Sequence, residues 1–217
     1  MEDCSADVII SDLSPVQKKL LKSVSMPAMV YDCPSYFNSA GYNIETNPET
    51  TPKLKDLINL VTLDLKDEGA ILVYTIYKET QMAIYKYLSA LGISVAVMNG
   101  DTSLKERNDY INKFVLGDIK VLVTNVQKGL DFNNCNHCIF YDYDPSSSKM
   151  VQFEGRMERE HNIVGKHIYI LVSRGNELKK FKTILADKAK ASDMFAGSDF
   201  SCIMELLLDD ERLKQLV

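Results

Sequence analysis

At residues 121–132 the chain reads Val-Leu-Val-Thr-Asn-Val-Gln-Lys-Gly-Leu-Asp-Phe, an apolar run that continues into a polar loop with a glycine. The run is typical of a buried strand. Thr124 and Asn125 place a hydroxyl and backbone donors at the carboxyl end of that strand, and Gly129 allows another molecule to approach the backbone closely. The stretch therefore predicts a sheet strand whose loop contacts phosphate groups.

The sequence on both sides repeats this alternation of apolar runs and helical patterns. Buried strands are predicted at residues 71–75, 95–100, 120–124, 137–141 and 167–172. Between them, residues 81–91 and 104–114 carry apolar side chains near helical spacing. Strands that alternate with helices predict an α/β fold with a mostly parallel sheet flanked by helices.

Signals for the ends of the second helix agree with this pattern. Thr102 or Ser103 can cap its first turn, Glu106 supplies the acid of a capping box, and Gly117 ends it. In such a sheet the loops that follow the strands form the working edge, so functional residues are expected there.

Residues 1–69 differ from the rest of the chain. Residues 13–21 read as the start of a helix, and residues 52–60 resume a helical pattern. Pro27, Pro34, Pro48 and Pro52, with Asn and Ser between them, predict an irregular connector that leads up to this second helical segment.

A second motif lies at residues 152–159, which read Gln-Phe-Glu-Gly-Arg-Met-Glu-Arg. Arg156 and Arg159 stand three residues apart, so on a short helix their guanidinium groups share one face. Both can then point at a single anionic ligand across an interface. A triphosphate is the candidate for that ligand.

The two motifs together resemble those of superfamily 2 helicases, nearest to the Swi/Snf-type or DEAD/DEAH-like translocases. Residues 121–132 are similar to helicase motif V, and residues 152–159 are similar to the arginine-finger motif. Residues 13–17 and 53–57 resemble segments that lead into the second motor lobe of Swi/Snf-type enzymes. Residues 160–162, Glu-His-Asn, replace the Ile-Gly-Gln expected of those enzymes, so a simpler DNA translocase fits better than a chromatin remodeller.

The resemblance implies a division of the chain into three parts. Residues 1–50 would form an N-terminal extension or connector with a short helix, residues 51–195 a RecA-like helicase C-terminal domain, and residues 196–217 a C-terminal helix. In that family a first RecA-like lobe carries the phosphate loop and the acids that bind Mg²⁺, and the second lobe closes over the nucleotide.

The resemblance also implies roles for individual residues. Arg156 and Arg159 would be catalytic, stabilising charge at the γ-phosphate while it is transferred to water. Contacts with ATP are expected from Gln152, Gly129, Asp131 and Gly155. Sequence-independent contacts with the nucleic-acid backbone are expected from Thr75, Asn99, Gly100, Arg107, Thr124 and Asn125.

The sequence contains no Gly-x-x-x-x-Gly-Lys-Ser/Thr loop. We therefore expect this chain to use ATP with Mg²⁺ only together with a first lobe, in the same parent chain or as a separate subunit, and not to hydrolyse ATP alone. DNA is expected as the substrate rather than RNA. The alternative is a non-catalytic nucleic-acid or partner-binding module with a degenerate helicase fold, whose arginines form ion pairs with Glu154, Glu158 or Glu160.

Composition sets wider bounds. The 217 residues are 46% hydrophobic and 25% charged, with a formal net charge of −5, which disfavours a broad basic surface without excluding a narrow track for nucleic acid. No apolar run of about 20 residues predicts a membrane span, so an intracellular, soluble protein of the cytoplasm or nucleus is expected. Cys135 and Cys138 form a lone Cys-x-x-Cys at the entry to a predicted strand, and no metal site is expected.

Overall fold

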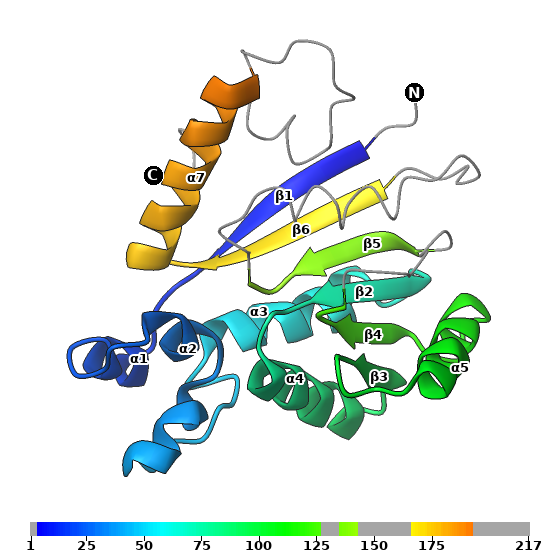
Figure 1. Ribbon diagram of the computed structural model, residues 1–217, viewed down its shortest axis with the longest axis horizontal. Coiled ribbons are helices and arrows are strands. Elements are labelled where there is room, and N and C mark those ends of the chain that lie inside the picture. Colours follow the sequence, from blue (N-terminus) through cyan, green and yellow to red (C-terminus); the bar gives the residue numbers. More distant parts are fainter. Residues whose placement is uncertain (1–3, 127–134, 143–165, 193–217) are drawn as a thin grey trace.

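The computed structural model describes residues 4–126, 135–142 and 166–192, with the backbone alone for residues 185–192. The strands of these residues form one sheet in the order β1-β6-β5-β2-β4-β3, and neighbouring strands run parallel (Figure 1). They are β1 (Cys4–Ser11), β2 (Ala70–Tyr74), β3 (Val95–Met98), β4 (Val121–Thr124), β5 (Cys135–Phe140) and β6 (Lys166–Ser173). The predicted α/β class and its parallel sheet are confirmed.

The central strands consist of the apolar runs because both of their faces are covered. Every residue of β4 is buried, as are four of the five residues of β2. Parallel sheets covered on both faces have such continuous hydrophobic strands rather than alternating ones. All five strands predicted from these runs are present, with bounds that shift by at most a few residues.

Helices cover the two faces of the sheet. On one face lie α3 (Pro52–Asn59), the short π-helical segment η2 (Leu60–Asp64) and α4 (Lys78–Ala90), where Leu57 and Leu88 pack against Ile71. On the other face lie α5 (Leu104–Val115) and α7 (Asn176–Ser192), where Phe114 and Phe181 belong to the core formed with Leu72 (Figure 1). The result is a three-layer arrangement with a core on each side of the sheet.

The ends of α5 follow from local sequence. Ser103 is the N-cap: its hydroxyl accepts from the Glu106 N–H at 3.3 Å, and the Glu106 carboxylate accepts from the Ser103 N–H at 3.0 Å. Of the two candidate caps, Ser103 therefore has the role. Gly117 lies just beyond the helix with φ of +83°, a left-handed conformation that glycine adopts readily.

The N-terminal region contains a strand that the sequence analysis did not predict. Strand β1 pairs with β6 over its whole length, from Cys4 opposite Lys166 to Ser11 opposite Ser173. Ala6 is buried in the core, and Val8 and Ile10 pack against it. Residues 4–11 are thus part of the sheet rather than a separate extension.

Short helices follow β1: α1 (Pro15–Leu20), α2 (Pro27–Asp32) and the 3₁₀ helix η1 (Pro34–Ala40). The predicted helix near residue 13 is confirmed as α1, and the predicted helix from residue 52 as α3. The stretch expected to be irregular contains α2 and η1, which begin at Pro27 and Pro34 because proline suits the first turn of a helix. Leu20, Met29, Val30 and Phe37 join these elements in a small core of their own.

Candidate functional site

The carboxyl ends of β2, β4 and β5 lie next to one another because β2 stands between the other two strands. Thr75 follows β2, and its backbone N–H donates to the carbonyl of Thr124 at 3.1 Å. The Asn125 amide donates to the carbonyl of Ile76 at 3.3 Å. The fold thus brings Thr75, Thr124 and Asn125 together, as the sequence predicts for residues at strand ends.

The hydroxyl groups of both threonines are engaged inside the protein. Thr75 is fully buried, and its hydroxyl donates to the carboxylate of Asp142 at 2.5 Å. Thr124 is also fully buried, and its hydroxyl accepts from the Val126 N–H at 3.0 Å. Both hydroxyl groups therefore form hydrogen bonds inside the protein that hold the strand ends in place. Asn125 is partly exposed.

Asp142, which follows β5, is a further site residue that the sequence analysis did not identify. Its second carboxylate oxygen accepts from the Ile76 N–H at 2.8 Å, so it joins the ends of β2 and β5. Burial raises the pKa of Asp142 from its ordinary value of 3.8 to about 6, against the effect of these hydrogen bonds and of Lys53. The signal was available, because a carboxylate directly after a buried strand lies at the same edge as Thr75.

This raised pKa predicts a specific pH dependence of stability. The folded protein holds the Asp142 proton more tightly than the unfolded chain does, so ionisation destabilises the fold as pH rises from about 4 to above 6. The difference in pKa corresponds to about 3 kcal/mol. The side chain in Asp142→Asn does not ionise. Measured by urea unfolding, the free energy of unfolding of the variant relative to that of the wild type should therefore increase by about 3 kcal/mol between pH 4 and pH 7.

Asp32 and the other carboxylates are present in both proteins, so the difference between the two pH slopes reports Asp142 together with its charge effect on the pKa of Asp32. Asp109→Asn, a change to an exposed residue of α5, is the matched control and should leave the pH profile as it is. Parallel profiles for wild type and Asp142→Asn would contradict the raised pKa.

The loop after β3 forms a second part of this edge, and Arg107 ties it to α5. The Arg107 guanidinium donates to the carbonyls of Thr102 at 2.9 Å, Asn99 at 3.0 Å and Gly100 at 3.2 Å. The Asn99 amide in turn donates to the side chain of Gln81 at 3.3 Å. Three residues predicted from sequence, Asn99, Gly100 and Arg107, are therefore brought into one hydrogen-bonded unit.

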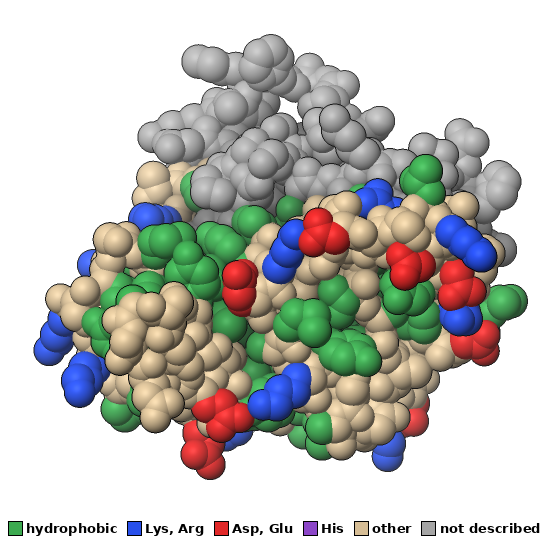
Figure 2. All heavy atoms as spheres, turned by 60° about the horizontal axis from the view of Figure 1, so that its bottom comes forward, with side chains coloured by type: hydrophobic (Ala, Val, Ile, Leu, Met, Phe, Trp, Pro, Cys, Tyr) green, Lys and Arg blue, Asp and Glu red, His purple; other side chains and the backbone are tan. Residues whose placement is uncertain are grey.

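The same unit leaves room for a ligand. Gly100 is exposed, and a Cβ atom added to it would have no neighbouring atom within 4 Å. The face of the molecule in Figure 2 shows basic and acidic side chains interspersed rather than gathered by sign. A nucleic acid on this face would therefore meet local donors rather than a broad basic field.

A buried ionic cluster lies behind the edge and was not foreseen as a cluster. The Lys53 ammonium donates to Asp32 and to Glu177, each at 2.7 Å, and the three residues come from α3, α2 and α7. Burial lowers the pKa of Lys53, but the two carboxylates outweigh it and the pKa lies above its ordinary value. Burial raises the pKa of Asp32 well above its ordinary value, against the effect of Lys53. The ammonium also lies 5.4 Å from the centre of the Tyr141 ring.

Other predicted site residues lie outside the residues that the structure describes. They are Arg156, Arg159, Gln152, Gly155, Gly129 and Asp131.

Cys135 and Cys138 are both buried in β5, in agreement with their predicted place in a strand. Burial raises the pKa of the Cys135 thiol to about 12. Within the described ranges, no three His, Cys, Asp or Glu side chains are grouped so as to hold a metal ion. A search of the same ranges finds no helix with the length and hydrophobicity needed to cross a membrane.

Comparison with known proteins relates this geometry to a family. The model of the helicase conserved C-terminal domain matches residues 52–161, about half of the chain. The chain is 22% identical over 181 residues to the ATP-dependent RNA helicase abstrakt of Drosophila melanogaster, an alignment that covers 76% of this chain and 29% of that protein. Among four curated relatives that it matches, the chain spans 17% to 29% of their length.

Solved structures show the same fold. The C-terminal domain of the Sulfolobus solfataricus SWI2/SNF2 ATPase is 20% identical with a TM-score of 0.65, and the match covers 99% of this chain and 98% of that one. The core of that ATPase in complex with dsDNA is 19% identical with a TM-score of 0.69, over 98% of this chain and 50% of that one. The chain therefore belongs to the family of the helicase conserved C-terminal domain, and its fold is that of a RecA-like helicase C-terminal domain.

Proposed function

We propose that the chain is the second motor lobe of an ATP-dependent DNA helicase or translocase. The observation that carries this proposal is the unit formed by Arg107 with the loop of Asn99 and Gly100, beside Asn125 at the same edge of the sheet. Polar side chains and exposed backbone on loops at one edge of the sheet suit a protein that holds a nucleic acid without reading its sequence. In this proposal, membership of the helicase family implies ATP-driven movement, and this edge of the sheet binds the nucleic acid.

The nucleotide would be shared with a first lobe. In this proposal Arg156 and Arg159 reach its γ-phosphate, Asp131 meets a ribose hydroxyl, and Gln152 positions the arginines. Gly129 and Gly155 allow the backbone to come close. The first lobe would hold the remaining phosphates and Mg²⁺, because this sequence has no phosphate loop of its own.

DNA is the proposed nucleic acid, and the comparisons offer support for both kinds. One matched structure is an ATPase core with dsDNA, and one matched relative is named as an RNA helicase. Phosphate contacts release counterions, so affinity should fall as salt rises, with a slope of about −1 to −4 on logarithmic axes for a few contacts. Fluorescence anisotropy of the chain with labelled duplex DNA and with RNA of the same sequence measures both slope and preference.

A slope near zero for both nucleic acids would contradict backbone binding at this edge. Higher affinity for RNA, with a steeper salt dependence, would leave the proposal of an ATP-driven motor standing and would make RNA its substrate. A response that is steeper and tighter for DNA is the expected result.

Substitution of Arg107 tests whether this edge of the sheet binds DNA. Arg107→Ala removes hydrogen bonds to the carbonyls of Asn99, Gly100 and Thr102, so the loop loses its fixed shape. DNA affinity is expected to fall about tenfold, the effect of losing one charged hydrogen-bonding group. Arg174→Ala, which removes an exposed partner of Asp12, is the matched control and should bind DNA as the wild type does.

The proposed motor is tested by ATP hydrolysis, measured for this chain alone and for a protein that joins it to a first helicase lobe. We expect activity only in the joined protein, stimulated by nucleic acid. Activity in neither would favour the non-catalytic binding module instead. Activity in the chain alone would contradict the two-lobe proposal.

A further inference from the structure

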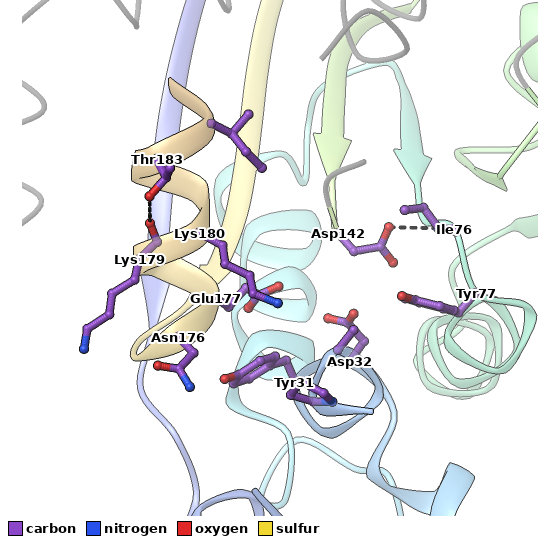
Figure 3. A pocket seen from close by; sticks show the side chains of 13 residues that line it. Tyr31, Asp32, Ile76, Tyr77, Asp142, Asn176, Glu177, Lys179, Lys180 and Thr183 are labelled. Carbon is purple, nitrogen blue, oxygen red and sulfur yellow. Dashed lines mark hydrogen bonds between the residues drawn. The ribbon is translucent and has the colours of Figure 1, made fainter. Parts of the chain in front are cut away.

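A cavity of about 650 Å³ opens at the carboxyl edge, on the side of β2 away from the Asn99 loop (Figure 3). Its walls come from α2, the start of α4, the end of β5 and the first turns of α7. Residues that matter to its chemistry are Tyr31, Asp32, Ile76, Tyr77, Asp142 and Glu177. None of these is among the residues expected to meet ATP or nucleic acid.

The floor of the cavity carries more negative than positive charge. Asp32, Asp142 and Glu177 are all buried, and Lys53 is the cation that pairs with Asp32 and Glu177. Asp142 receives hydrogen bonds from the neutral Thr75 hydroxyl and Ile76 N–H. Buried carboxylates are costly unless they take up a proton or are paired with a positive charge, so a cation entering here would stabilise their ionised form.

Three polar groups that line this space have no hydrogen bond among the described residues: the Tyr31 hydroxyl, the Tyr77 hydroxyl and one oxygen of Asp32. Asp32 is only 1% exposed, and while one of its oxygens accepts from Lys53, its other oxygen has no hydrogen bond there. The Tyr77 hydroxyl likewise has none. Figure 3 shows the Asp32 carboxylate, the Asp142 carboxylate and the Tyr77 hydroxyl pointing toward one another. These three groups converge on one position where a donor with several N–H groups would fit.

The walls favour an organic cation rather than a metal ion. The rings of Tyr31 and Tyr77 and the side chain of Ile76 line the cavity. Aromatic faces attract guanidinium and ammonium groups, and apolar walls accommodate a hydrocarbon stem. Lys179 and Lys180 also line the cavity and are exposed to solvent; Figure 3 shows Lys180 pointing into the cavity toward Glu177 and Lys179 pointing away from it.

We propose that this cavity binds a guanidinium group carried on a hydrocarbon stem. Asp142 and the free oxygen of Asp32 accept its N–H groups in the forked geometry that carboxylates and guanidinium share. Tyr77 and Tyr31 flank its stem. The same chemistry occurs in a free small molecule and in an arginine side chain of another polypeptide.

Isothermal titration calorimetry of the full chain distinguishes these sources, without ATP or nucleic acid present. The probes are agmatine, for a small molecule, and the capped peptide acetyl-Gly-Arg-Gly-amide, for a side chain. At least one should bind with a dissociation constant below about 1 mM. The peptide with citrulline in place of arginine has the same shape without the charge and should bind at least tenfold more weakly.

Variants locate the binding. Asp142→Asn should weaken the better probe at least tenfold, and Tyr77→Ala, which removes the ring and hydroxyl, about fivefold. Asp109→Asn is the charge-matched control and should leave affinity unchanged. Thermal unfolding measures whether each variant is folded. If one of the two variants does not fold, the other still tests the proposed site.

The proposal is overturned if neither probe binds, if citrulline binds as well as arginine, or if both Asp142→Asn and Tyr77→Ala bind like the wild type. Tighter binding of agmatine points to a small-molecule ligand, and tighter binding of the peptide points to a protein partner. The readout is independent of ATP hydrolysis and DNA affinity, so its failure leaves the motor proposal standing.

Discussion

Arg159→Ala, made in the protein that joins this chain to a first lobe, should lower the rate of ATP hydrolysis by about 10³ to 10⁵, the usual contribution of an arginine finger. The reason is electrostatic: the guanidinium would stabilise charge that develops on the γ-phosphate in the transition state. Turnover under saturating ATP and DNA measures the effect. DNA affinity, measured by anisotropy, should stay within about twofold because the phosphate of the nucleotide and that of the DNA are separate ligands.

The control for this change is Arg174→Ala, which removes a surface guanidinium paired with Asp12 and should leave turnover unchanged. If Arg159 instead forms a structural ion pair with Glu154, Glu158 or Glu160, its loss would lower the melting temperature and spare the rate per folded molecule. Unchanged turnover in a folded Arg159→Ala protein would refute the arginine-finger assignment.

Lys53→Met should lower the free energy of unfolding by about 3 to 5 kcal/mol, because it leaves Asp32 and Glu177 buried without their cation. Methionine keeps the length of the side chain, so the loss reports the charge rather than a cavity. Urea unfolding near neutral pH measures it. Asp32, whose pKa burial already raises, would then take up a proton more readily, so the loss should shrink as pH falls.

Lys113→Met is the matched control for this prediction. Lys113 also pairs with a carboxylate, Asp109 at 2.8 Å, but both side chains are about half exposed. Exposed pairs one helical turn apart contribute about 0.3 to 0.5 kcal/mol. A loss of less than about 1 kcal/mol for Lys53→Met would show that the buried carboxylates are neutral in the folded protein.

The strands and helices of the sheet could be predicted because their signals are local. The apolar run at residues 121–124 has no polar member before Thr124, and the capping box of Ser103 and Glu106 spans only four residues. Strand β1 was missed for the opposite reason. Val8, Ile9 and Ile10 are a short β-branched run between acidic and polar residues, and only the partner strand β6, far along the chain, makes it part of the sheet.

The site was predictable to the same extent. The family resemblance pointed to Asn99, Gly100 and Arg107, and the structure joins them by hydrogen bonds, while their contact with nucleic acid stays a prediction. Lys53 could not be placed in the same way. Lys53 lies near the start of an amphipathic helix, where a lysine normally faces solvent, and its partners are 21 and 124 residues away. Long-range pairing of this kind leaves no periodic trace in the sequence.

The pairing of β1 with β6 also constrains the order in which the protein can be assembled during synthesis. Ser5 lies opposite His167, 162 positions further along the chain, so β1 cannot pair with β6 until that later strand has emerged. Glu177, the second partner of Lys53, emerges later still. Contacts between such distant segments form slowly because the intervening loop must first be closed. Val8 to Ile10 therefore wait longer for their partner strand in the nascent chain than the central strands do.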